Sequence, residues 1–318
     1  MGRARGANAL MNLAFETAYG TPPASGYKQM PFVSSQLGAE QALTESDLLG
    51  LGRAPSDPML DVVTNDGDVV VPIDSQAFGW WLRLLFGAQA PTADGDGYIH
   101  TFRSGAIAIP SASAEIGHPD VPAYSTNYGL RANTLQIQMR RNGWLDATIG
   151  LIGQGENALA ATSSAGMPTA FDATLNKRFT QPTGQVLVDD VQVGGVVEAT
   201  ISFSNVLEKV ETIRPSGEIE DSDPGMPTAS LGLTLKFADR ALMLKATSGT
   251  PVKIVLSWSI PGANRTLRIE LPRVFLPRSK RPVTGPAGIQ VTVNAMASTP
   301  TGGSMMSVIL RNDVASYA

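Results

Sequence analysis

The chain has 318 residues, of which 43% are hydrophobic and only 16% are charged, and its net charge is −4. This balance argues against a dedicated nucleic-acid-binding protein, because such proteins neutralise phosphates with clustered lysine and arginine. The absence of cysteine excludes disulfides and thiolate metal sites. The longest apolar run, Phe78–Phe86, contains Arg83 and is far shorter than the roughly 20 residues of a membrane span. We therefore expect a protein that is made and kept in the cytoplasm, with no membrane contact.

The length allows one large domain or two domains of about 150 residues each. The 32 glycines and 22 prolines are dispersed along the chain, which indicates a folded protein with many turns. The charged fraction is low against the typical quarter, and such a surface often has large areas in contact with other subunits.

Residues 1–30 carry few periodic signals, which is typical of an N-terminal arm that either frays or folds over a neighbouring subunit. Within this arm a short strand is expected over Leu10–Phe15. Residues 32–43 are expected to be extended, and a long polar loop follows over residues 44–66.

The stretch Gly67–Gly87 predicts a strand that runs directly into a helix. Asp74 and Ser75 offer N-cap oxygens for a helix that begins near Gln76. Gly87 can adopt the left-handed conformation that ends such a helix. The apolar residues first alternate, as in a half-buried strand, and then recur at spacings of three and four: Val69, Val71 and Ile73, followed by Phe78, Trp81, Leu82 and Leu85.

The remainder of the first half predicts more strands, and the Asn142-Gly143 dipeptide before the last of them is a hairpin-turn signal. The small and polar stretch 158–166 is typical of a linker. The strands are expected over Tyr98–Phe102, Ile107–Ile116, Thr134–Met139 and Asp146–Ile152.

The second half repeats the order of the first. A hairpin is expected in which Gln185–Val193 pairs with Val197–Phe203 across two glycines. A charged loop, 208–228, leads to a second strand-helix unit, Leu231–Gly249, in which Asp239 caps the helix. Further strands are expected over residues 252–260, 266–276, 288–297 and 305–310.

A constant shift along the chain superposes Val33 on Val197 and Asp57 on Asp221, which we interpret as a duplication. The predicted fold is mainly β, with two tandem β-sandwich or barrel-like domains and a short α-helix flanking each. The expected divisions are an arm over 1–30, a first domain over 31–157, a linker over 158–184 and a second domain over 185–318.

No motif in the chain predicts catalysis. The two histidines, His100 and His118, stand apart, and neither an HExxH nor a GxSxG motif occurs. The glycine-rich stretch 150–155 fits neither a dinucleotide fingerprint nor a P-loop, so it indicates a turn at a strand end. A Ser-His-Asp site assembled from distant residues stays an open alternative. We expect no catalytic residue, no cofactor and no metal ion.

Two charged runs each allow a plain and a functional interpretation. The acidic run 218–223 lacks the full ligand set of an EF-hand, which favours a solvated loop over a cation site. The basic run 273–281 is either a solvated arm or an arm that pairs with acidic loops on another subunit. The charged residues are Glu218, Glu220, Asp221 and Asp223 in the first run, and Arg273, Arg278, Lys280 and Arg281 in the second.

Several stretches of the sequence, in this order, resemble the tail tube proteins of long-tailed bacteriophages and prophages. They are GRARGANALMNLAFETAYGTPP, MPFVSSQLGAE, DLLGLGR, GDVVVPIDSQAFGWWLRLLFG, GPAGIQVTVNAMA and VILRNDVASY. The resemblance covers most of the chain. It implies a structural virion protein whose rings stack into a hollow tube through which DNA passes to the host.

The resemblance further implies that the chain is made in the host cytoplasm and ends in the virion tail. Its implied partners are other copies of itself, the tape measure, the tail terminator and the distal tail protein. DNA would be a non-specific partner, present only in transit. Many members of this family have one tube domain and form hexamers, whereas this chain is about twice as long. A trimeric ring with pseudo-sixfold symmetry is therefore favoured, and a hexamer with an outward second half is the alternative.

Other expectations accompany this interpretation. The net charge of −4 suggests a predominantly negative lumen, because a basic wall would hold DNA back. The charged loops 44–66 and 208–228 are candidates for contacts between stacked rings. Trp80 and Trp81 are expected to anchor a core or an interface. The alternative function is a non-phage β-sandwich that binds, for example, carbohydrate through Trp80, Trp144 and Trp258.

Overall fold

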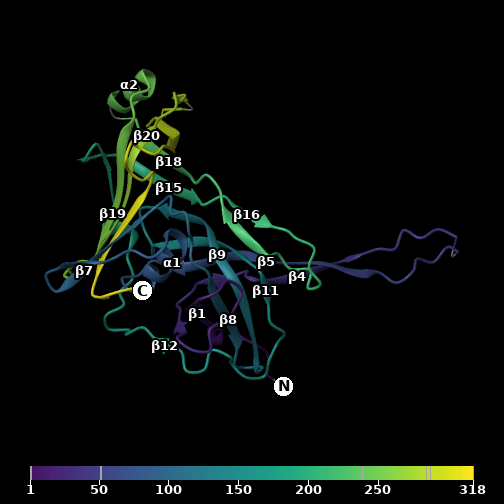
Figure 1. Ribbon diagram of the computed structural model, residues 1–318. Coiled ribbons are helices and arrows are strands. Elements are labelled where there is room, and N and C mark those ends of the chain that lie inside the picture. The colour runs from purple at the N-terminus through teal and green to yellow at the C-terminus, as the bar shows by residue number, and fades with distance from the viewer. Residues whose placement is uncertain (1, 51, 238–239, 284, 287, 318) are drawn as a thin grey trace.

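Antiparallel strands make up most of the structure, a computed structural model that describes residues 2–50, 52–237, 240–283, 285, 286 and 288–317. Two short α-helices accompany the strands, one in each half of the chain. The expected mainly β, sandwich-like fold is confirmed, and the sheets do not close into a barrel. Figure 1 shows the arrangement of these elements.

The first half of the chain contains the helix α1 (Phe78–Phe86) and the strands β1 to β11. The strands are β1 (Leu10–Phe15), β2 (Lys28–Gln29), β3 (Ser34–Ser35), β4 (Gly38–Thr44), β5 (Met59–Pro72), β6 (Thr92–Asp94), β7 (Gly97–Arg103), β8 (Ala112–His118), β9 (Ala123–Met139), β10 (Asp146–Gly153) and β11 (Gly155–Glu156).

The rest of the chain contains the helix α2 (Ala241–Ser248) and the strands β12 to β22. The strands are β12 (Thr169–Ala170), β13 (Gln185–Val188), β14 (Val191–Gln192), β15 (Val196–Ser204), β16 (Leu207–Val210), β17 (Asp221–Pro224), β18 (Thr228–Lys236), β19 (Val252–Ser259), β20 (Thr266–Phe275), β21 (Gln290–Ala297) and β22 (Ser307–Asn312). Two short 3₁₀ turns lie at Gly6–Asn8 and Gln181–Thr183.

One sheet runs through both halves of the chain, and we refer to it as the main sheet. Its strands lie in the order β4–β5–β10–β9–β15–β18–β21–β20, with β3 beside β5 as well. The pairing of β9 with β15 joins the two halves, with registers from Thr134 opposite Ser204 to Met139 opposite Ala199.

Two further layers pack against the main sheet. One contains β6, β7, β22, β20, β19, β13 and β14, and the other contains β12, β2, β1, β8, β9 and β11. The long strands β9 and β20 each pass from one of these layers into the main sheet. The apolar core between the layers is one continuous cluster with residues from both halves.

The same order of strand pairing occurs twice. In the first half β1 pairs with β8, β3 with β5, β5 with β10, β8 with β9, and β9 with β10. In the second half β13 pairs with β19, β15 with β18, β18 with β21, β19 with β20, and β20 with β21. The helix follows the corresponding strand in each, because α1 comes after β5 and α2 after β18. The two halves thus share one strand arrangement, while the domain boundaries stay a prediction.

The two helices differ in burial. The apolar side chains of α1, including Phe78, Trp81 and Phe86, are buried among the strands, and Phe86 contacts Phe203 with 5.0 Å between ring centroids. In α2 only Ala246 is fully buried, and the helix lies at one end of the molecule (Figure 1). The expected strand-helix units both occur, but the second helix adds only Ala246 to the core, with Leu242 and Met243 packed against it.

The ends of the helices differ in detail from the prediction. The helix α1 begins at Phe78 with Ala77 as its N-cap, so Asp74 and Ser75 lie before the cap. Asp74 still serves the helix, because its Oδ1 accepts hydrogen bonds from the backbone N–H groups of Gln76 and Phe78, both at 3.0 Å. Gly87 has φ 88° and ψ 171°, which is not the predicted left-handed helical conformation, whereas Gly249 after α2 does adopt it. The predicted cap at Asp239 lies outside the described residues.

One predicted hairpin is wrong. The strand β13 turns into β14 and also pairs with β19, and it does not pair with β15. The strand β15 instead lies between β9 and β18. The alternation of apolar and polar residues predicts these strands correctly, but it does not show which distant strand pairs with each of them.

The predicted linker, 158–184, is attached to the rest of the chain at several points. The buried Glu115 accepts hydrogen bonds from Ser163, Ser164 and the backbone N–H of Ala165. Further along, β12 adds to β2 in parallel. This segment therefore crosses the molecule in a fixed path.

Candidate assembly surfaces

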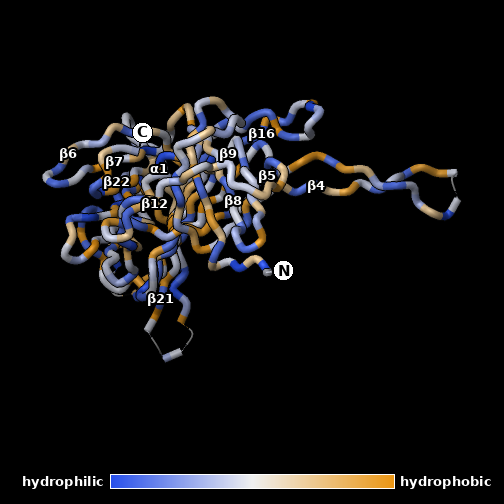
Figure 2. The backbone as a smooth tube through the Cα atoms, turned by 90° about the horizontal axis from the view of Figure 1, so that it is seen from below, coloured by the Kyte–Doolittle hydropathy of each residue, from blue (hydrophilic) through white to orange (hydrophobic). Residues whose placement is uncertain are grey.

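A two-stranded hairpin projects from the body of the molecule, where the sequence predicts a polar loop. It comprises residues 38–50 and 52–66, with β4 and the first part of β5 as its strands, and we call it the free hairpin. Figures 1 and 2 show it extending well beyond the other elements. Leu43 and Leu60 are register partners in it, and their side chains are 64% and 62% exposed. Met59 and Val62 are exposed as well.

Local bonds define the shape of the free hairpin. The side chain of Asp61 accepts from the Thr44 hydroxyl at 2.8 Å, and the Gln41 amide donates to the Asp61 carbonyl at 2.6 Å. The hydrogen bond from Thr44 and one from the Val62 N–H lower the pKa of Asp61. An isolated two-stranded ribbon is only marginally stable in water, and exposed apolar side chains on it mark a surface for a partner.

A second hairpin occupies the corresponding place after β15 but lies against the molecule. It is formed by β16 and β17, and we call residues 207–224 the docked hairpin. Asp221 pairs with Arg131 of β9, with Oδ1 and Nη1 2.7 Å apart. Glu218 accepts a hydrogen bond from the Tyr128 hydroxyl at 2.6 Å. Desolvation by burial is the main cause of the raised pKa of Tyr128, and this hydrogen bond is the second.

Apolar contacts support the docked hairpin. Leu207 and Ile219 form a small buried cluster with Ile109 and Ile152 of the first half. The Lys209 ammonium lies 2.8 Å from a carboxylate oxygen of Asp66, at the base of the free hairpin. The predicted acidic run 218–223 is therefore part of an intramolecular contact, while residues 211–216 stay exposed, so the ring contact through 208–228 stays a prediction.

The basic run 273–281 lies at the opposite end of the main sheet. The pairing of β20 with β21 is limited to Val274 opposite Ala297 and Phe275 opposite Met296, after which the chain leaves the sheet. The charged side chains of this run, Arg273, Arg278, Lys280 and Arg281, are all exposed. None of them forms an ion pair within the part of the chain that the structure describes.

The face of the main sheet that points away from the core is polar. Apolar side chains such as Ile137, Ile201 and Leu233 point inward, so their neighbours along each strand point outward. Most of the outward residues are uncharged, and Asp68, Asp146, Glu198 and Lys236 add charges. The uncharged ones include Thr134, Gln136, Gln138, Thr148, Thr200, Ser202, Ser230, Thr234, Thr292 and Asn294.

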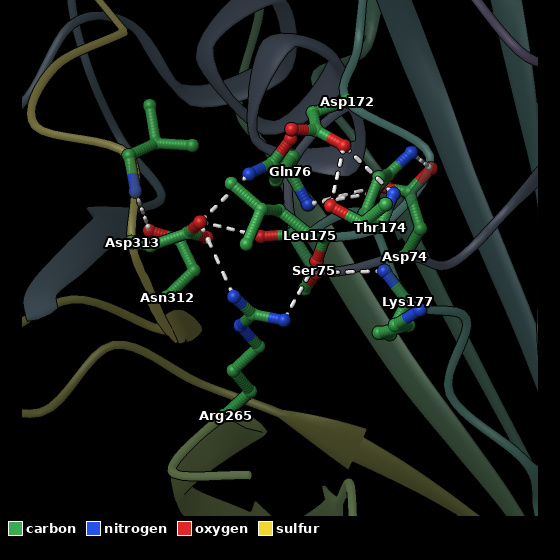
Figure 3. Close-up of polar contacts among 12 residues, drawn as sticks. Asp74, Ser75, Gln76, Asp172, Thr174, Leu175, Lys177, Arg265, Asn312 and Asp313 are labelled. Atoms are coloured by element: carbon green, nitrogen blue, oxygen red, sulfur yellow. Dashed lines mark hydrogen bonds and ion pairs between the residues drawn. The ribbon is translucent and has the colours of Figure 1, made fainter.

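A polar cluster fixes the C-terminal segment to the start of α1 (Figure 3). Asp313 accepts from the Gln76 amide at 2.9 Å and pairs with Arg265 at 3.2 Å. The Asn312 amide donates to the Ser75 carbonyl at 2.6 Å. Burial raises the pKa of Asp74, although the hydrogen bonds it accepts oppose this shift. Each of these groups bonds another part of the same chain, so the cluster acts as a structural clamp.

The residues considered for chemistry do not come together. His100 is buried and its Nε2 lies 2.8 Å from the Val314 carbonyl, whereas His118 ends β8 on another layer. The stretch 150–155 continues from β10 into β11. No group of His, Asp or Glu side chains among the described residues is placed to hold a metal ion.

The tryptophans do not form one binding face. Trp81 and Trp258 are 1% exposed and belong to the core, and Trp80 is partly buried and stacks on Phe15 with 5.1 Å between centroids. Trp144 is exposed, and the Arg178 guanidinium lies 4.7 Å from its ring centroid. The expected core role holds for Trp81, and the proposed carbohydrate platform of Trp80, Trp144 and Trp258 is not assembled.

A mainly β body with a projecting hairpin that exposes apolar side chains is typical of a protein that binds partners through that surface. The family model described as phage tail tube protein matches residues 6–297. The chain belongs to this family. A search of the curated proteins finds no match.

Membership gives the tail tube chain a structural role in the virion tail and implies assembly with itself and with other tail proteins. The resemblance seen in the sequence is thereby confirmed. Within the described residues, no helix is long and apolar enough to cross a membrane. The sequence identified the family but did not predict that the free hairpin is a pair of strands. Neither face of this hairpin is covered, so its apolar and polar residues do not alternate in the way that predicts a strand.

Proposed function

We propose that this tail tube protein forms trimeric rings with pseudo-sixfold symmetry, which stack into the hollow tube that DNA crosses on its way to the host. The observation that carries the proposal is the repeated strand order of the two halves, joined by the β9–β15 seam. We take residues 31–157 and 185–318 as the two tube domains, with an arm over 1–30 whose strand β1 pairs with β8 of the first domain, and a linker over 158–184.

The seam between the halves supplies a pattern for the contacts between chains. Within the chain, the last main-sheet strand of the first half, β9, pairs with the first main-sheet strand of the second half, β15. Between chains, β20 of one copy takes the place of β9, because it is the last main-sheet strand of the second half. The strands β3 and β4 of the next copy take the place of β15. Repeating the seam there makes a heterologous contact that can close into a ring. Closure also removes exposed strand edges that otherwise invite uncontrolled pairing.

In this ring the outward face of the main sheet lines the lumen. Its threonine, serine, glutamine and asparagine side chains are neutral, and its central strands carry Asp68, Asp146 and Glu198 against Lys236. A wall of this kind offers few cations to the DNA phosphates, so DNA slides without adhesion. The excess of acids agrees in sign with the predominantly negative lumen expected from the sequence, which stays a prediction.

Stacking of the rings uses the tip of the free hairpin, residues 45–50 and 52–58. Leu48 and Leu49 are exposed there, and the tip lies far from the rest of the body (Figure 2). The tape measure, the tail terminator and the distal tail protein are the further partners of the assembled tube. Synthesis takes place in the host cytoplasm.

Electron microscopy of the purified protein tests the proposal. We expect rings or tubes, with three chains in each ring and an inner wall without unpaired lysine or arginine rows. Monomers at high protein concentration would contradict self-assembly. Rings of six chains with the second half on the outside would contradict the trimer and favour the hexameric alternative.

A further inference from the structure

We propose that the free hairpin of one copy binds the basic segment of a second copy, in the way that the docked hairpin binds β9 and β10 within the chain. The basic segment comprises residues 273–281 together with Met296. This inference rests on the proposed function, because it names the surfaces that join neighbouring copies.

The contact of the docked hairpin with β9 and β10 is the pattern for the proposed contact of the free hairpin with the basic segment of another copy. The docked hairpin follows β15 and precedes β18, and the free hairpin follows β3 and leads into β5. These strands correspond in the repeated order of pairing, so the two hairpins occupy the same position in their halves. One hairpin has its receiving surface in the same chain. The other has no receiving surface among the described residues of its own chain beyond its base.

The receiving surfaces also correspond. Arg131 directly precedes Ala132, which is buried and pairs with Leu151 of β10. Arg273 directly precedes Val274, which is buried and pairs with Ala297 of β21. Arg131 already holds Asp221 of the docked hairpin. Arg273 has the same place in the second half and is exposed without an ion pair among the described residues.

The charges of the two surfaces are complementary. The free hairpin carries one arginine, Arg53, against acidic side chains at Glu40, Glu45, Asp47, Asp57, Asp61 and Asp66, of which Asp66 pairs with Lys209. The basic segment carries Arg273, Arg278, Lys280 and Arg281 with no acid among them. Opposite charges steer such surfaces together and exclude pairing of either surface with itself.

Both surfaces also expose apolar side chains beside their charges. On the basic segment, Phe275 and Met296 are register partners and are 37% and 69% exposed. On the free hairpin, Leu43 and Leu60 are exposed in the same way. In the docked hairpin this role belongs to Leu207 and Ile219, which are buried against the first half. Apolar burial ringed by ion pairs is the usual composition of a specific interface.

Charge reversal tests the proposal. The variant Arg273→Glu/Arg278→Glu is compared with Arg103→Glu/Lys177→Glu, which makes the same change of charge at exposed positions elsewhere. All four positions are on the surface, so the melting temperature of each variant should stay near that of the wild type. We expect the first variant to lose about tenfold or more of the protein that sediments as tubes, and the control to keep it.

A rescue variant separates ion pairing from a general loss of assembly. Adding Glu40→Lys, which is exposed on a strand of the free hairpin and outside the tip assigned to ring stacking, to Arg273→Glu/Arg278→Glu restores opposite charges on the two surfaces, so tubes should return. Normal tubes from the first variant, or no recovery in the combined variant at unchanged melting temperature, would overturn the proposal. If the wild-type protein forms no rings or tubes at all, it is the proposed function that fails.

Discussion

Burial determines which single residues respond to pH in this protein. His100 is 1% exposed, its ring lies edge-on to Tyr317 at 4.7 Å, and its Nε2 donates to the Val314 carbonyl. Desolvation by burial lowers the pKa of His100, although the bond to Val314 opposes the shift. The histidine is therefore neutral in the folded state under conditions where an exposed histidine begins to take up a proton.

The free energy of unfolding should consequently fall as the pH drops below about 6.5, the unfolded pKa of histidine. The folded state binds fewer protons than the unfolded state in this range, so protonation favours unfolding. We expect the melting temperature of the wild type to decrease more between pH 7.5 and 5.5 than that of His100→Gln. Parallel pH dependences of the two proteins would show that His100 does not titrate differently in the folded state.

Gly79 provides a second test at the residue scale. A Cβ atom at this position would lie 2.0 Å from the ring of Tyr317, whose hydroxyl donates to the Gln76 carbonyl at 2.7 Å. Helix propensity alone predicts that Gly79→Ala stabilises α1 by up to about 1 kcal/mol. Packing predicts a loss of about 1–3 kcal/mol, because the buried ring has to move. Chemical denaturation decides between them, and a stabilised variant would contradict the packing described for the C-terminal segment.

At the scale of elements, the sequence identifies strands well where one face is buried. The alternation in β15, β18 and β21 predicts them with boundaries close to those observed, since their inward residues pack in the core. The first part of β5 escapes detection because both of its faces are exposed in the single chain. The partner of β13 is β19, more than sixty residues away, and alternation does not encode such a pairing. The assembly surfaces follow the same rule, because the basic run is visible in the sequence but its place at the end of the main sheet is not.

The free hairpin should contribute to assembly and not to the stability of the single chain. In Leu43→Ser/Leu60→Ser two exposed register partners become polar, so the free energy of unfolding should change by less than about 0.5 kcal/mol. Tube formation should decrease strongly, as measured by sedimentation and electron microscopy. Val191→Ser, at an exposed site in β14, serves as the control and should assemble normally. A large loss of stability in the double variant would mean that the hairpin belongs to the fold of the single chain.

At the scale of the whole molecule, the two halves have one strand arrangement but different surroundings. The helix α1 is buried in the core, whereas α2 lies at an end and buries little. The docked hairpin binds its own chain, whereas the free hairpin projects. Each chain therefore contains one contact between halves, that of the docked hairpin with β9. It also presents the free hairpin and the basic segment, which we propose to form the same contact between two chains. Differences between the halves then allow contacts within a chain and between chains to be tuned separately.

The number of chains in each ring tests this account most directly. A cryo-electron microscopy reconstruction of the assembled tube, at a resolution that separates strands, gives that number and the order of strands around the wall. We predict three chains in each ring, with both halves of every chain alternating around the lumen and a seam like β9–β15 at every junction. Six chains in each ring, with only the first half of each chain lining the lumen, would contradict it.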